Sequence, residues 1–266
     1  MNERSETVKY FVGIDVQARR GCTGRRTLER SQIMSTDFSA KTGCVEGNCQ
    51  NGYGKYINAD GAVYHGQFQN AGPNGEGVLN FPDGSYYEGD WKDGQRHGKG
   101  KYFFANGNEY QGSFENGIIQ GTGVFKTPDG LRYDGEWQNG KFHGKGKMSF
   151  PGGGVYEGSF RNGHRRGEGT ETSADGAVYT GYWKDDLYDG EGILIRTDGT
   201  VYDGHWETNK AHGYGTLTLQ NGGVYQGGYK HGEFHGHGRM LTPEGDVEYD
   251  GEWRDGKQIT DNPSNG

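Results

Sequence analysis

The sequence predicts an all-β protein: an elongated, single-layer antiparallel sheet built from consecutive β-hairpins. Three observations lead to this fold class. Tyrosines recur every 23 residues from Tyr64, each followed by glycine at the second position and by an aromatic residue at the fourth. Only 30% of the 266 residues are apolar while 53 are glycine, so an ordinary globular core is not expected. The 13% aromatic content argues against disorder, because disordered chains contain few aromatic residues.

The period extends through most of the chain. After Tyr64 the motif tyrosine returns at steps of 23 as far as Tyr225, and Tyr249 follows after one step of 24. A Gly-x-Gly pair recurs at the eleventh and thirteenth positions after each tyrosine, as in Gly98 and Gly100. A fixed period of this length is the signature of a repeat protein, in which each unit packs on its neighbours.

Each repeat has the pattern of one hairpin. The residues at positions 0, 2 and 4 share one face of an extended strand, while the intervening residues, such as Glu88 and Asp90, face the other way and are mostly polar. Turn residues follow, as in Asp93-Gly94, and a second strand is predicted to begin at Gly-x-Gly. A second turn such as Pro82-Asp83-Gly84 closes the unit. Since glycine has no Cβ, a neighbouring ring can lie on the backbone, and we expect a ladder of aromatic rings along one face.

The charge distribution narrows the range of partners. The net charge is −8, and outside residues 1–40 the chain holds 21 Lys and Arg against 31 Asp and Glu. An acidic repeat region repels phosphate, so nucleic acid is not an expected partner, and an anionic membrane would need local basic patches. The N-terminus lacks a signal-like apolar segment, and no apolar run approaches the roughly 18 to 20 residues that span a bilayer. We expect a cytoplasmic protein, at most peripheral at a membrane or a cytoskeletal structure.

Three segments carry a resemblance to a known family. Residues 87–100 read Tyr-Glu-Gly-Asp-Trp-Lys-Asp-Gly-Gln-Arg-His-Gly-Lys-Gly, and residues 133–146 and 225–238 are similar. This pattern resembles a near-consensus MORN (membrane occupation and recognition nexus) repeat, and the resemblance covers about residues 41–257. It implies a solenoid-like rod of β-hairpins with a groove that serves protein binding, membrane association or self-assembly.

The register of the repeats predicts how the chain is organised. Residues 41–63 form a degenerate capping repeat, residues 64–248 hold eight repeats, residues 249–257 form a partial C-terminal repeat, and residues 258–266 are a tail. Residues 1–40 do not match the repeat and are interpreted as a flexible basic leader. The alternative is a basic arm that docks on acidic lipid or on a partner.

Cys44 and Cys49 lie in the capping repeat, on either side of a hairpin turn expected at Val45 to Asn48. Cross-strand Cβ atoms come close at such a turn, so the pair could form a disulfide that staples this repeat. The missing signal peptide and an odd third thiol, Cys22, instead favour free cysteines. Both alternatives remain open at this point.

No residues show the pattern of a catalytic or cofactor site, so we expect neither an enzyme nor a bound cofactor. Four histidines share the tenth position of their repeats, which repeat architecture explains better than catalysis does: His97, His143, His212 and His235. The nearest approach to a ligand cluster is His231-x3-His235-x-His237, which lacks a Cys or a converging carboxylate, and no metal site is predicted. The Gly-x-Gly pairs open strands rather than a helix, unlike phosphate-binding loops.

The regular aromatic face favours a non-catalytic scaffold that binds a segment of a partner protein. Self-assembly of the scaffold is a further option. A single-layer sheet is expected to leave the ring edges partly exposed along a groove, where Tyr and Trp would anchor a peptide. The residues predicted to line this groove are Tyr64, Phe68, Tyr87, Trp91, Tyr110, Phe114, Tyr133, Trp137, Tyr156, Phe160, Tyr179, Trp183, Tyr202, Trp206, Tyr225 and Tyr229. The alternative function is a peripheral membrane protein that binds acidic phospholipids or phosphoinositides through basic turns or the N-terminal arm.

Overall fold

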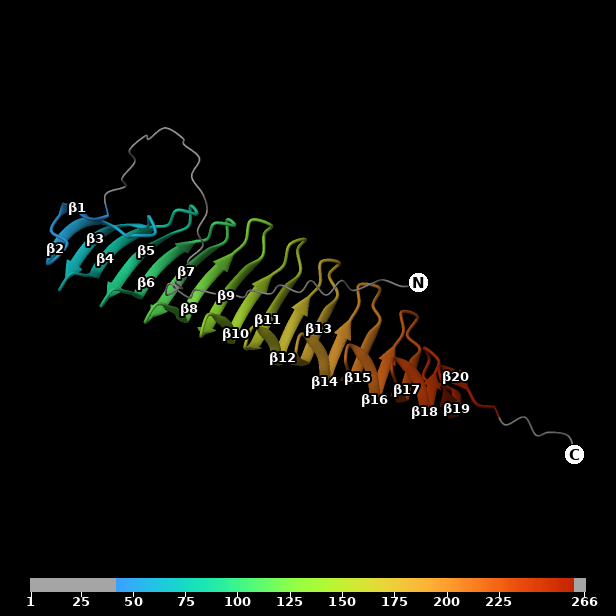
Figure 1. Ribbon diagram of the computed structural model, residues 1–266. Coiled ribbons are helices and arrows are strands. Elements are labelled where there is room, and N and C mark those ends of the chain that lie inside the picture. Colours follow the sequence, from blue (N-terminus) through green and yellow to red (C-terminus); the bar gives the residue numbers. More distant parts are fainter. Residues whose placement is uncertain (1–41, 261–266) are drawn as a thin grey trace, which may run out of the picture. The chain divides into compact units, whose positions relative to one another are not determined.

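The computed structural model describes residues 42–260, and in this range the protein consists of twenty β-strands and no helix (Figure 1). The strands are β1 Gly43–Gly47, β2 Gly52–Ile57, β3 Val63–Gln69, β4 Gly72–Asn80, β5 Tyr86–Lys92, β6 Gln95–Phe103, β7 Glu109–Glu115, β8 Ile118–Lys126, β9 Arg132–Gln138, β10 Lys141–Ser149, β11 Val155–Arg161, β12 His164–Thr172, β13 Val178–Lys184, β14 Leu187–Ile195, β15 Val201–Glu207, β16 Lys210–Thr218, β17 Val224–Lys230, β18 Glu233–Leu241, β19 Val247–Arg254 and β20 Lys257–Gln258. Within this part of the chain, no helix has the length and apolar character needed to cross a membrane. The predicted all-β class, with an antiparallel sheet of consecutive hairpins, is confirmed.

The described chain divides into two compact units. The first runs to Gly121 and includes Asn139–Lys141, and the second comprises Thr122–Gln138 and the residues from Phe142 onward. Within each unit, strands that follow one another in the sequence pair antiparallel, as β3 does with β4 and β13 with β14. The leader predicted at residues 1–40 lies outside the described residues, as do Lys41 and residues 261–266 of the predicted tail.

Two-residue turns join the strands of each hairpin from β3–β4 to β19–β20. In the β5–β6 hairpin Asp93 and Gly94 have φ values of 50° and 75°, the left-handed pair that a type I′ turn requires. This turn keeps the strands paired up to its edge, where Lys92 faces Gln95. The second strand therefore begins at Gln95, three residues before Gly98, and the predicted start at Gly-x-Gly is wrong. Asn and Gly tolerate positive φ best, which explains the Asn-Gly and Asp-Gly pairs of the sequence.

A β-bulge recurs in the second strand of the repeats, and the motif tyrosine satisfies the carbonyl opposite it. In the β11–β12 pair Gly158 faces Gly169 and Phe160 faces Arg165, so Ser159 alone opposes residues 166–168 and has no regular partner in this ladder. The Tyr156 hydroxyl donates a hydrogen bond to the Ser159 carbonyl at 3.0 Å. The ring reaches this carbonyl because it lies over glycine. A Cβ at the matching glycine of another repeat, Gly215, would lie 2.6 Å from the Tyr202 hydroxyl, far inside van der Waals contact.

The N-terminal cap differs from its predicted geometry. β1 continues to Gly47, and the turn lies at residues 48–51 rather than at the predicted Val45 to Asn48. The Asn48 side chain causes this shift, because its Oδ1 accepts hydrogen bonds from the backbone N–H groups of Gln50 and Asn51, each at 3.0 Å. Cys44 and Cys49 are joined in a disulfide with their Cα atoms 5.9 Å apart, the alternative that the sequence favoured less.

Candidate functional site

The sixteen aromatic residues predicted to line a groove are buried. In each unit they lie on one side of the sheet, here called the core face, with exposed fractions between 0% and 7%. The expectation that their edges remain partly exposed is wrong. Each motif tyrosine is covered on several sides: Tyr156, for example, makes edge-on contacts with Phe160 of its own repeat at 5.2 Å and with Trp183 of the next at 5.0 Å between ring centroids.

A third group of side chains completes this burial and was missed in the sequence. The residue nine positions after the motif tyrosine lies over the tyrosine ring, as where Tyr188 stacks on Tyr179 with centroids 3.6 Å apart and planes at 9°. Arg165 fills the same position in its repeat, with its guanidinium 4.1 Å from the Trp183 ring centroid and an ion pair to Glu171 at 2.8 Å. An apolar residue or Arg recurs at this ninth position in most repeats, a signal that the sequence does contain.

The opposite side of the sheet, the polar face, holds a hollow of about 770 Å³ in the second unit. Its floor is a line of glycines that oppose one another across successive strands, with Gly146 facing Gly158 and Gly169 facing Gly181. The same glycines admit the tyrosine rings on the core face. A Cβ atom at these glycines would point into the core face, so only backbone lies on the polar face at these positions. An open channel therefore runs between the two rows of side chains on either side. We call this channel the polar-face hollow.

The walls of the polar-face hollow are more acidic than basic. The hollow is lined by four carboxylates and two lysines: Asp134, Glu157, Glu168, Glu191, Lys145 and Lys147. Lys147 is 3.5 Å from Glu157, so this lysine is already partnered by one of the acids. Asp134 on β9 lies 2.7 Å from Arg132. The other two carboxylates are Glu168 on β12 and Glu191 on β14, of which Glu191 lies 3.2 Å from Nδ1 of His205.

Tyr182 is an exposed aromatic residue between these two acids. Its side chain is 46% exposed although its strand neighbours Trp183 and Tyr179 are buried. The Tyr182 hydroxyl donates a hydrogen bond to Glu168 at 3.0 Å, and this bond raises the pKa of Tyr182. On the same face beyond the hollow, Ile193 and Tyr214 are 39% and 67% exposed. The polar face thus offers apolar and aromatic surface. Of these three residues, Tyr182 holds a first-strand position that strand parity predicts to be mostly polar.

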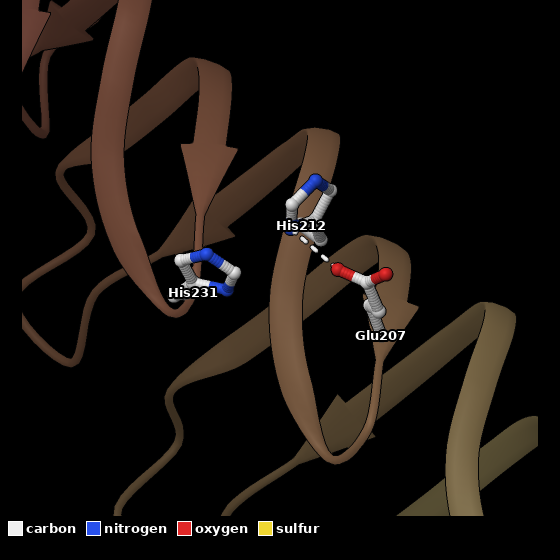
Figure 2. Close-up of side chains that lie close together, drawn as sticks. All are labelled: Glu207, His212 and His231. Atoms are coloured by element: carbon white, nitrogen blue, oxygen red, sulfur yellow. Dashed lines mark ion pairs between the residues drawn. The ribbon is translucent and has the colours of Figure 1, made fainter.

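The three histidines singled out in the sequence do not converge. His235 Nδ1 lies 3.6 Å from Asp255, and His237 Nε2 lies 3.4 Å from Asp250. His231 instead lies beside His212, with ring centroids 5.5 Å apart. Together with Glu207 these two histidines bring three ligand atoms within 4.8 Å of one another, a grouping that no sequence spacing suggested (Figure 2).

The repeat itself matches a known family. A family model described as "MORN repeat" matches consecutive segments at residues 43–63, 64–86, 87–109, 110–132, 133–155, 156–178, 179–201, 202–224, 225–247 and 249–258. The chain belongs to the MORN repeat family. The MORN repeat is a non-catalytic repeat scaffold, so the family points to interaction rather than to chemistry.

The chain is only distantly similar to individual proteins. No curated protein matches the sequence. Among solved structures, this MORN repeat chain is similar to the TCP domain of Drosophila melanogaster SAS-4 (dCPAP), in complex with a proline-rich motif of Ana2, at 13% identity and a TM-score of 0.39, covering 68% of this chain and 99% of that one. It is also similar to the TCP10 domain of Danio rerio CPAP, at 13% identity and a TM-score of 0.35, covering 79% of this chain and 99% of that one. Neither likeness is close enough to carry an argument about function.

Proposed function

We propose that this protein is a non-catalytic interaction scaffold whose polar-face hollow binds an extended, basic segment of a partner protein. The observation that carries this proposal is a glycine-floored channel with Glu168 and Glu191 on its wall and the exposed ring of Tyr182 between them. The sixteen aromatic residues of the core face support the proposed site indirectly, because they hold the sheet that forms it.

The shape of the channel suits an extended chain. Successive strands of a sheet lie about 4.8 Å apart, so side chains on one row of the sheet recur at nearly regular intervals along the channel. A peptide backbone can approach the glycine floor closely because no Cβ atom projects into the channel from there. The peptide's own alternate side chains would then reach the two walls.

The charge and the exposed ring define the chemistry of the partner. Two carboxylates at the wall, Glu168 and Glu191, attract Lys or Arg side chains and repel acidic segments. An Arg guanidinium can also stack on the ring of Tyr182 while it contacts Glu168. The same acidic wall disfavours acidic phospholipids at this site, so the peptide is preferred here over the lipid alternative.

A binding titration tests the proposal. Fluorescence anisotropy with a labelled peptide of alternating Arg and Val residues should show saturable binding to the full chain, and a peptide with Gln in place of Arg should bind at least about tenfold more weakly. The double variant Glu168→Gln/Glu191→Gln should lose at least about tenfold in affinity, whereas the matched surface variant Glu244→Gln/Glu248→Gln should not.

Two results would overturn the proposal. One is equal affinity of the charged and the neutral peptide, and the other is an unchanged affinity of the Glu168→Gln/Glu191→Gln variant. Flotation with vesicles that contain acidic phospholipid provides the comparison with the membrane alternative. Binding to these vesicles without binding to the basic peptide would replace the proposed function with the lipid one.

A further inference from the structure

Glu207, His212 and His231 form a cluster of potential metal ligands in the second unit (Figure 2). Glu207 is the last residue of β15, His212 lies in β16, and His231 lies in the turn between β17 and β18. One ligand atom from each side chain lies within 4.8 Å of the other two. His212 Nδ1 is 3.1 Å from a carboxylate oxygen of Glu207. This pair is within ion-pair distance but lacks hydrogen-bond geometry, and within the described part of the chain the buried Nδ1 has no hydrogen-bond partner.

The backbone of two successive hairpins brings these residues together. Glu207 faces Lys210 across the turn of the β15–β16 hairpin, which places His212 two residues further along the returning strand. The turn of the next hairpin docks beside it, because the backbone N–H of Gly232 donates to the carbonyl of Ala211 at 2.8 Å. His231 precedes that glycine, so its side chain is held next to His212 by main-chain geometry.

Equivalent positions in other repeats of this unit hold ion pairs. Where the second hairpin strand meets the next turn, Arg166 lies 3.6 Å from Asp185, and His235 lies 3.6 Å from Asp255. The position equivalent to Glu207 is Lys184 or Lys230 in the neighbouring repeats. Some repeats have all three of the equivalent positions within residues 42–260. Of these, only one carries His, Cys, Asp or Glu at every one of the three positions, namely Glu207, His212 and His231.

His231 is also unusual for its place in the turn. It has a φ of 53° at the first position of a type I′ turn, where Asn, Asp or Gly is preferred. The other turns of this kind carry mostly Asn or Asp there, as at Asn162 and Asp185. Turn geometry therefore does not account for a histidine at this position, and departures from local preference are often associated with function.

We propose that Glu207, His212 and His231 bind a divalent transition-metal ion, with Zn²⁺ as the best match. Two imidazoles and one carboxylate are a ligand set that Zn²⁺ accepts, whereas Ca²⁺ and Mg²⁺ prefer oxygen ligands alone. Ligands about 2.0–2.2 Å from a tetrahedral Zn²⁺ lie roughly 3.3 Å apart, so the exposed side chains of Glu207 and His231 need only rotate inward. Water would complete the coordination. The ion would then link two successive hairpins of the array.

Metal titration of the untagged, full-length protein tests this inference, with the Cys44–Cys49 disulfide intact and Cys22 replaced by Ser so that no free thiol competes. Calorimetry with Zn²⁺ should give one site per chain. Co²⁺ as a spectroscopic probe should develop the intense visible bands of four- or five-coordinate ligation. The variants Glu207→Gln, His212→Ala and His231→Asn should each weaken Zn²⁺ binding by at least about tenfold. His231→Asn restores the preferred turn residue, so its effect cannot be attributed to unfolding.

His235→Ala is the matched control, because His235 occupies the same repeat position as His212 but lies 3.6 Å from Asp255. In that repeat Lys230 stands at the position equivalent to Glu207. Its Zn²⁺ affinity should stay within about twofold of the parent. The inference is overturned if the parent binds no Zn²⁺ up to millimolar concentration, if His231→Asn binds as tightly as the parent, or if His235→Ala loses as much affinity as His212→Ala. None of these readouts depends on the peptide binding proposed for the polar-face hollow.

Discussion

The indole Nε1 of Trp183 donates a hydrogen bond to the carbonyl of Gly169 at 3.2 Å, which joins one repeat to the repeat before it. The same bond links Trp206 to Gly192 at 2.9 Å. Where the array carries Phe at this position, as at Phe160, the ring packs alike but has no N–H to donate. The alternation of Trp and Phe along the sequence therefore changes how strongly neighbouring repeats are coupled.

Replacing Trp183 by Phe tests the strength of this link. The variant loses the bond to Gly169, and the smaller Phe ring also fills less of the buried site and loses contact with Arg165. We therefore expect the free energy of unfolding to fall by more than about 1 kcal/mol. Urea unfolding followed by circular dichroism measures the change. Tyr182→Phe, which removes an exposed hydroxyl, is the control and should change stability by less than about 0.5 kcal/mol. Equal effects of the two variants would contradict this account.

Tyr229 breaks the pattern of satisfied core hydroxyls. Its side chain is 6% exposed, its hydroxyl has no hydrogen-bond partner among residues 42–260, and burial raises its pKa. A buried, unpaired hydroxyl costs free energy, so Tyr229→Phe should leave the stability unchanged or raise it by up to about 1 kcal/mol. Tyr202→Phe provides the contrast, because it removes a hydroxyl that donates to the His205 carbonyl at 2.9 Å. It should lower the stability, and a comparable loss in Tyr229→Phe would show that the Tyr229 hydroxyl is satisfied after all.

The buried tyrosines make the fold sensitive to alkali. Burial raises the pKa of Tyr156 and of Tyr225 to about 12, from an ordinary value of 10. Between pH 10 and pH 12 the unfolded chain releases these phenolic protons while the folded chain keeps them. The unfolded state then binds fewer protons, so the free energy of unfolding falls as the pH rises through this window. The urea concentration at the midpoint of unfolding, measured at pH 8, 9, 10 and 11, should be constant at first and then decline. The decline should accompany an increase in the tyrosinate absorbance that appears when the chain unfolds. Midpoints that stay level to pH 11 would refute the prediction.

The disulfide between Cys44 and Cys49 should stabilise the first hairpin. It closes a short loop, with a sequence separation of 5, for which the chain-entropy model gives about 2 kcal/mol. Reduction, or the double variant Cys44→Ser/Cys49→Ser, should increase amide hydrogen exchange in β1 and β2 and leave β15 to β18 unchanged. Mass spectrometry of the unreduced, alkylated protein shows directly whether the bond is present. Modification of both thiols before reduction would exclude it.

Local rules account for the parts of the fold that the sequence predicted correctly. Strand parity assigned Tyr156 and Phe160 to one face, and Asn-Gly and Asp-Gly pairs located the turns between strands. The error at the second strand, which begins at Gln95 rather than at Gly98, arose because a two-residue turn leaves no gap before pairing resumes. The cap turn was misplaced because the side chain of Asn48 redirects the backbone, an effect that depends on its hydrogen bonds.

By itself, the sequence determined the repeat, its hairpins and its core face, because a period of 23 residues and an alternation of two are properties of the chain alone. Only the tertiary structure decided what is exposed. The motif rings are buried because each is covered by the next repeat and by a side chain nine positions on, as Tyr188 covers Tyr179. Likewise, His212 meets His231 only because the bond from Gly232 to Ala211 docks one hairpin turn against the preceding strand. Contacts between repeats depend on the register of the sheet, which spacing within one repeat does not contain.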